Sequence, residues 1–138
     1  MKNTLTYLQA YNAMTKFIDA YYRKTLPEGI GIMLSDMEFL HDKTTGDPAT
    51  WNDWLKSLKK IDHNENMLSL EQSFDAMINF LKYYQDFAYS LEDIEKLLEY
   101  ILKMKNNSQD ESWLDWKKYL HQVLTEEDSR VYIKFISK

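Results

Sequence analysis

The sequence contains two similar halves, and this internal repeat constrains the fold more than any other feature. Residues 5–18, LTYLQAYNAMTKFI, match residues 68–81, LSLEQSFDAMINFL, with identical Leu, Gln, Ala, Met and Phe at equivalent positions. The pattern W-x-D-W-x-K-x-L then occurs at 51–58 and again at 113–120. The first pair is offset by 63 residues and the second by 62. Two matches in one order and register indicate a tandem duplication, with copies at 1–62 and 63–125 and a tail at 126–138.

The first helix of each copy is predicted to begin at a capping box, a hydroxyl residue followed three positions later by glutamine. The two boxes are Thr6 with Gln9 and Ser69 with Gln72. In this motif the hydroxyl accepts a hydrogen bond from a free amide at the helix start, and the glutamine side chain reaches back to the amide of the capping residue. Apolar residues then recur at helical spacing in both copies. We therefore expect one helix after each box.

Two further helices are expected in each copy. Pro27 disfavours helix at the residue before it, so the first helix should end near Leu26. A proline directly after an N-cap aspartate suits the first position of a helix, because its missing amide has no partner there anyway. The second and third helices of the two copies are expected, in chain order, at Ile30–Leu40, from Asp47, at Leu91–Lys105 and from near Asp110.

The tail ends in VYIKFIS, which fits either a helix or an alternating strand. We favour a helix, because a lone strand has no partner. A copy of about 60 residues buries little surface by itself, so the two copies should share one core. The expected architecture is all-α: a single domain over 1–138, folded as a compact bundle of six or seven helices from two tandem three-helix repeats related by an approximate twofold axis.

Composition and motifs narrow the classes of function. The chain has 17 basic and 22 acidic residues, a net charge of -5 that disfavours binding to nucleic acid. It has no cysteine, which excludes disulfides and thiolate chemistry and fits a reducing cytoplasm. The three histidines are never within four residues of one another, and neither a phosphate loop nor a nucleophile elbow is present. No segment is typical of a signal peptide or membrane span. We expect a cytoplasmic protein without catalytic residues, metal or cofactor.

One enzymatic alternative stays open, a pair of carboxylates in a cleft between helices. Convergent carboxylates of raised pKa would favour it. The W-x-D-W motif favours a structural role instead, because Trp51 and Trp54 share a helix face that is typical of core. Asp53 is expected in the first helical turn, where a carboxylate interacts favourably with the helix dipole. An aromatic surface for a ligand or partner is the alternative interpretation of this motif.

Acidic residues are concentrated in the second copy. Residues 63–125 carry eleven acidic and six basic side chains, whereas 1–62 carry eight of each. Glu92, Glu95 and Glu99 fall on one face of a predicted helix, opposite its apolar residues. One interpretation is a solvated helix face; the other is an acidic docking surface for a basic protein. The candidate partner-binding residues are Glu92, Glu95, Glu99, Asp86, Asp110 and Glu111.

The segment Gly29–Leu58, GIGIMLSDMEFLHDKTTGDPATWNDWLKSL, resembles small helical bacterial immunity proteins of contact-dependent growth inhibition and related polymorphic toxin systems. The matching residues are Ile30, Gly31, Met33, Leu34, Asp36, Met37, Asp47, Pro48, Trp51, Asp53 and Trp54. The second copy keeps the tryptophan motif but lacks the Asp-Pro and glycine features. The resemblance implies a cytoplasmic protein that binds and neutralises one cognate toxin. It defines no toxin-contact residues.

The acidic balance adds that the toxin should be basic, as a nuclease is. The alternative is a general helical interaction or regulatory module without a toxin partner. The oligomeric state stays open.

Overall fold

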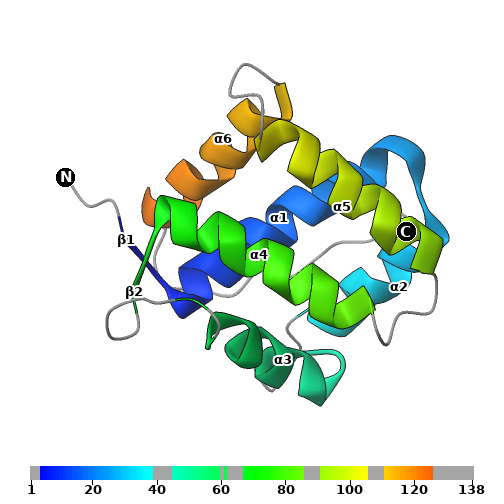
Figure 1. Cartoon of the computed structure of the whole chain (residues 1–138), viewed down its shortest axis with the longest axis horizontal. Coiled ribbons are helices and arrows are strands. Elements are labelled where there is room, and N and C mark those ends of the chain that lie inside the picture. Colours follow the sequence, from blue (N-terminus) through cyan, green and yellow to red (C-terminus); the bar gives the residue numbers. More distant parts are fainter. Residues whose placement is uncertain are drawn as a thin grey trace.

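The computed structural model describes residues 4–38, 45–59, 61, 67–85, 91–105 and 111–125. Within them the chain forms six helices and two short strands (Figure 1). The elements are β1 (Thr4–Thr6), α1 (Tyr7–Thr25), α2 (Glu28–Met37), α3 (Pro48–Leu58), β2 (Met67–Ser69), α4 (Leu70–Gln85), α5 (Leu91–Lys105) and α6 (Glu111–Thr125). The predicted helical bundle is confirmed. The order strand, helix, helix, helix occurs twice, but the duplication itself stays a prediction.

The two strands were not predicted. They pair antiparallel, with Leu5 opposite Leu68, and both leucines are fully buried. Each strand leads directly into a predicted capping box. The Thr6 hydroxyl accepts from the Gln9 amide at 3.0 Å, and the Gln9 side chain accepts from the Thr6 amide at 2.9 Å. The second box has the same two bonds, at 3.1 and 2.8 Å. Both boxes are therefore confirmed, and the extended N-cap of each continues backward as a strand.

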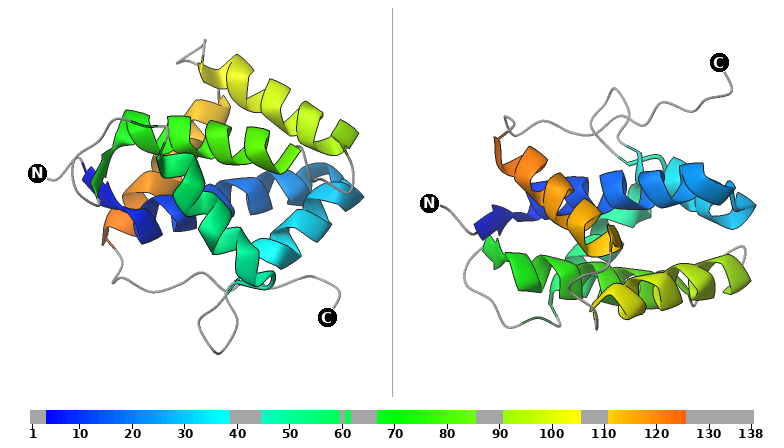
Figure 2. Two further views of the ribbon diagram at one scale, coloured as in Figure 1. Left: turned by 60° about the horizontal axis from the view of Figure 1, so that its bottom comes forward. Right: turned by 90° about the horizontal axis from the view of Figure 1, so that it is seen from above.

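The third helix of each half packs on the first helix of the other half. Helix α6 packs against α1, and α3 packs against α4. The second helices, α2 and α5, also contact each other. Figure 2 shows this crossed arrangement, with α6 beside α1 and α3 crossing α4. Neither half can therefore form this packing alone.

The apolar core contains residues of both halves in one cluster. Two tryptophans of the W-x-D-W motifs lie at its centre, and both are fully buried. Trp54 contacts Phe80 edge-on, with ring centroids 6.1 Å apart, and Trp116 contacts Phe17 at 5.8 Å. Each of these contacts joins one half to the other. The structural interpretation of these tryptophans and the expectation of a shared core are thus confirmed.

Helix α1 ends at Thr25, as Pro27 predicts. The next residue, Leu26, has a left-handed backbone with φ 53° and ψ 48°, and its amide donates to the Tyr22 carbonyl at 2.7 Å. A leucine in this region clashes through its Cβ, whereas glycine does not. Because the Leu26 side chain is 60% exposed, packing does not offset the strain.

We expect Leu26→Gly to raise the free energy of unfolding by about 0.5–1 kcal/mol. Glycine relieves the backbone strain of the folded protein, and the greater entropy that it gives the unfolded chain offsets part of this gain. Urea denaturation of both proteins measures the difference. The matched control is Thr25→Gly at the preceding exposed, right-handed residue, which should instead destabilise the protein. Destabilisation by both substitutions would contradict the strain at Leu26.

Helix α2 begins two residues before the predicted start and ends at Met37 rather than Leu40. The backbone of Glu38 is extended, which terminates the helix. Helix α3 begins as predicted, with the Asp47 carboxylate accepting from the Ala49 amide at 3.0 Å and proline at the first position. Two backbone bonds tie this start to the end of α2: Gly46 donates to the Glu38 carbonyl, and Asp47 donates to the Asp36 carbonyl.

The predicted tail at 126–138 lies outside the described residues, so the choice between helix and strand there is untested. Within the described residues, no helix combines the length and the apolar character that crossing a membrane requires.

Candidate functional site

The predicted acidic residues of α5 lie on its solvent-facing side. Glu92, Glu95 and Glu99 are all exposed, and we call them the acidic row. The opposite side of the helix is anchored in the core through Ile94, Leu97, Leu98, Ile101 and Met104. A helix with this division presents its carboxylates on a fixed support, because its apolar side is held by packing.

Lysines border the acidic row. Lys96 pairs with Glu92 at 3.2 Å, one turn apart, and their side chains are 63% and 77% exposed. The hydrogen bond and charge of Glu92 raise the pKa of Lys96. Lys103, also exposed, lies two turns along from Lys96. Glu95 and Glu99 have no ion-pair partner among the described residues, so they are the carboxylates of the row that are open to a partner.

The side chains of the other three predicted site residues are not described by the structure. Asp86 and Asp110 lie outside the described residues, as does the side chain of Glu111, the first residue of α6. The structure therefore tests the placement of the acidic row alone.

A neighbouring carboxylate, Asp93, holds α5 against α2. Its Oδ2 accepts from the Gly29 amide at 2.8 Å. This amide is in the first turn of α2, where helix amides lack partners within the helix and favour negative charge. Burial raises the pKa of the nearby Tyr21, and the charge of Asp93 raises it further. Asp93 is thus occupied inside the fold and is not part of the exposed acidic row.

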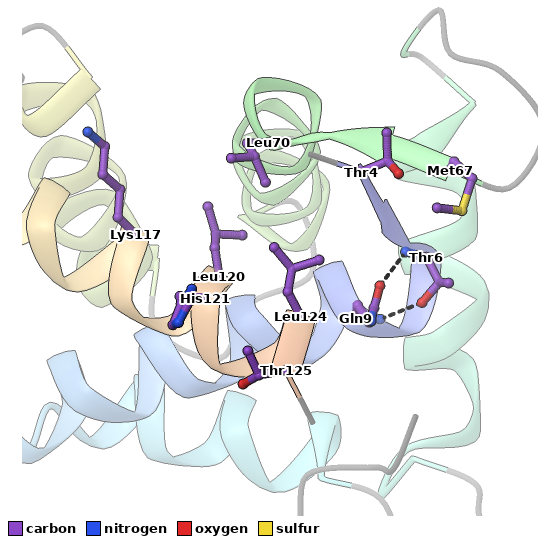
Figure 3. Close-up of a pocket in the computed structure, with 10 residues that line it drawn as sticks. All are labelled: Thr4, Thr6, Gln9, Met67, Leu70, Lys117, Leu120, His121, Leu124 and Thr125. Atoms are coloured by element: carbon purple, nitrogen blue, oxygen red, sulfur yellow. Dashed lines mark hydrogen bonds between the residues drawn. The ribbon is translucent and has the colours of Figure 1, made fainter. Parts of the chain in front are cut away.

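A second candidate site is a groove between the β1–β2 pair and the C-terminal half of α6 (Figure 3). Its volume is about 610 Å³, within the range of small-ligand sites. Leu120 and Leu124 point toward Leu70 at the start of α4, as Figure 3 shows. The remaining lining residues are Thr4, Thr6, Gln9, Met67, Lys117, His121 and Thr125.

This groove was missed in the sequence. Its residues come from two strands, from the starts of α1 and α4 and from the C-terminal half of α6, and the unpredicted strand pairing brings these segments together. Gln9 also links the strand to α6, because its Nε2 donates to the Val123 carbonyl at 3.3 Å. The available signal was the spacing of Leu120, His121 and Leu124, which places them on one stripe of a helix.

Asp53 of the first W-x-D-W motif is not in the first helical turn, so that expectation was wrong. Helix α3 begins at Pro48, and no acidic residue lies in its first turn. Burial raises the pKa of Asp53, and the charge of Asp47 also raises it. Lys56 and a hydrogen bond with Tyr83 lower the same pKa, but burial is the larger effect.

The raised pKa of Asp53 gives a pH-dependent prediction. The folded protein binds the proton of the Asp53 carboxyl group more tightly than the unfolded chain does. The free energy of unfolding therefore decreases as the pH rises from the pKa in the unfolded chain, about 3.9, through the higher pKa in the folded protein. Asp53→Asn cannot ionise, so its stability relative to the wild type should increase from pH 3 to pH 7. Urea denaturation across this range measures the difference. A variant that loses stability relative to the wild type as pH rises would contradict it.

Among the described residues, no group of three or more His, Cys, Asp or Glu side chains is arranged to hold a metal ion. Asp53 is a described carboxylate with a raised pKa, and the groups that interact with it are Lys56, the carboxylate of Asp47 and Tyr83.

Comparisons with known proteins match no protein family, no curated protein and no solved structure.

Proposed function

We propose that this chain is a non-catalytic immunity-type protein that binds and neutralises a cognate basic toxin of the nuclease kind. The observation that carries the proposal is the exposed acidic row on α5, a helix held rigidly by its core side and by the Asp93 bond to α2. A fixed line of carboxylates suits binding to a toxin whose substrate is a polyanion. The carboxylates would compete with the phosphates of that substrate for the cationic side chains of the toxin.

The charge of the chain supports the same partner. The net charge of -5 arises in the half that contains α5. Such a field accelerates the encounter with a basic protein and disfavours acidic partners. Glu95 and Glu99 are the central residues of the proposed contact, because Glu92 already pairs with Lys96.

Capture of partners from the native lysate, with the products of neighbouring genes confirmed present, tests the proposal. Three tagged baits are compared: the wild type, Glu95→Gln/Glu99→Gln, and a control variant. The control changes the net charge by the same +2, but at positions outside the acidic row. The control changes exposed positions on α1 and α3, Thr25→Lys and Asn52→Lys.

The wild type and the control should retain a basic protein in a stoichiometric complex. The row variant should bind it about tenfold more weakly, because two interfacial charge contacts are lost. Addition of the wild type should also abolish the activity of the captured partner. Recovery of bait alone would contradict the proposal. Capture of an acidic, non-toxic partner would replace it with a regulatory interaction module.

A further inference from the structure

The groove between the strand pair and α6 has an apolar part and a basic end. Leu120 and Leu124 of α6 point toward Leu70 of α4 and form the apolar part (Figure 3). Lys117 lines the groove at the end nearer the start of α6. Its ammonium group lies over the ring of Trp113, 5.7 Å from the ring centroid. The groove therefore offers a cation beside one end of an apolar surface.

The charge of the groove is opposite to that of the chain. The sequence has 22 acidic and 17 basic residues, but none of the described residues that line the groove is acidic. Lys117 and His121 both line it, and both are exposed. Neither forms an ion pair within the part of the chain that the structure describes. A surface of this composition attracts an anion and disfavours a cation.

The polar residue at the strand end of the groove is already used within the fold. Oε1 of Gln9 accepts from the Thr6 amide at 2.9 Å, and Nε2 donates to the Val123 carbonyl at 3.3 Å. Among the described lining residues, Lys117 and His121 are then the side chains with nitrogen donors left for an anionic group. An anion is therefore expected at their end, and an apolar tail at the other.

The first half of the chain has different residues at the equivalent positions. Tyr7 follows the first capping box as Leu70 follows the second, and Leu55 of the first tryptophan motif corresponds to Lys117 of the second. Tyr7 and Leu55 are half-buried and pack against the core. The second half thus has a smaller side chain in place of a large aromatic one, and a cation in place of an apolar side chain. Both exchanges favour an open, basic groove at this place in the fold.

We propose that this groove binds a small amphipathic carboxylate, a single-chain fatty acid of medium length. The carboxylate accepts hydrogen bonds from the Lys117 ammonium and the His121 ring, and the alkyl chain covers the leucines. The stripe of α6 from Lys117 to Thr125 is about 12 Å long at the rise of a helix, similar to the extended length of octanoate. The volume of about 610 Å³ is within the range of small-ligand sites. This proposal is independent of the acidic row and of the proposed toxin.

Titration of the isotope-labelled full chain with octanoate, followed by amide NMR spectra, tests the site. The amides of β1 and of the C-terminal half of α6 should shift saturably, with a Kd on the order of 100 μM. Octanol has the same tail without the charge and should bind about fivefold more weakly, because the pairing with Lys117 is lost. Acetate, which lacks the tail, should give no saturable shifts. Equal affinities for octanoate and octanol, or saturable shifts only outside the groove, or none, would overturn the proposal.

Two variants separate the roles of space and charge. Leu70→Tyr introduces the residue that the first half has at the equivalent position, so it should fill the groove and weaken the binding of octanoate and octanol at least about tenfold. Lys117→Gln/His121→Gln should weaken octanoate binding about fivefold and leave octanol binding unchanged.

The matched control for the charge variant is Lys82→Gln/Lys118→Gln, because both lysines are exposed and absent from the groove lining. It removes at least as much positive charge and should change octanoate affinity less than about twofold. Thermal unfolding verifies that each variant is folded; if Leu70→Tyr is not, the two charge variants decide. Equal losses in these two, or undiminished octanoate binding by folded Leu70→Tyr, would overturn the proposal.

Discussion

Replacement of Gly46 by alanine is expected to lower the free energy of unfolding by about 2–4 kcal/mol. A Cβ at this position would lie 2.0 Å from the backbone oxygen of Ser35 and 3.1 Å from its carbonyl carbon. The backbone of α2 cannot move aside as a side chain can, so the segment before α3 must lift away. The bonds from Gly46 to Glu38 and from Asp47 to Asp36 are then weakened or lost.

The matched control for this prediction is Gly31→Ala. Its Cβ would lie 2.9 Å from the ring of Tyr22, which is the far end of a half-buried side chain and can shift. The higher helix propensity of alanine offsets the shift, so we expect a change within about 1 kcal/mol. Urea denaturation of both variants measures the comparison. Similar losses for the two variants would contradict the close approach of Gly46 to α2.

Trp54→Phe is expected to destabilise the protein by about 2–4 kcal/mol, and by about 1–2 kcal/mol more than Trp116→Phe. Both indoles are fully buried, and phenylalanine leaves a comparable cavity at each site. The expected difference comes from the hydrogen bonding of the indole nitrogen, Nε1. Nε1 of Trp54 donates to the Tyr7 carbonyl at 3.2 Å, whereas Nε1 of Trp116 is buried without an acceptor among the described residues. Phenylalanine removes a hydrogen bond at the first site and an unsatisfied donor at the second.

The measurement for this pair is urea denaturation followed by far-ultraviolet circular dichroism, which does not depend on tryptophan emission. Equal costs at the two sites would mean that Trp116 has an acceptor as good as that of Trp54. Ser73 provides a structural reason why Trp116 lacks the hydrogen bond that Trp54 makes. Its hydroxyl donates to the carbonyl of Leu70 at 2.6 Å, and Leu70 occupies the position in the second half that Tyr7 occupies in the first.

The helix starts were predictable because their signals are local. Each predicted cap accepts a hydrogen bond from a helix amide no more than three residues away, so tertiary structure has little influence on it. This holds for the boxes at Thr6 and Ser69 and for the start at Asp47 and Pro48. The strands were not predictable for the opposite reason. Three residues carry no useful alternation, and Leu5 and Leu68 become a pair only after the chain has folded.

The candidate site was predictable only in part. Helical spacing placed Glu92, Glu95 and Glu99 on one exposed face. The same spacing places Lys96 beside Glu92, so the partial neutralisation of the row was also available from the sequence. The role of Asp93 was not predictable from the sequence, because its partner, the amide of Gly29, lies 64 residues away along the chain. The same holds for the groove, whose walls depend on the strand pairing.

The most direct test of the central claim is the association rate between this protein and its captured basic partner as a function of salt. If the acidic row steers the encounter, the rate should fall by about tenfold or more between low and physiological ionic strength. Glu95→Gln/Glu99→Gln should lower the rate at low salt and flatten this dependence, whereas Thr25→Lys/Asn52→Lys should preserve most of it. A rate that is insensitive to salt, or affected equally by the two variants, would contradict the claim that the acidic row of α5 binds the partner.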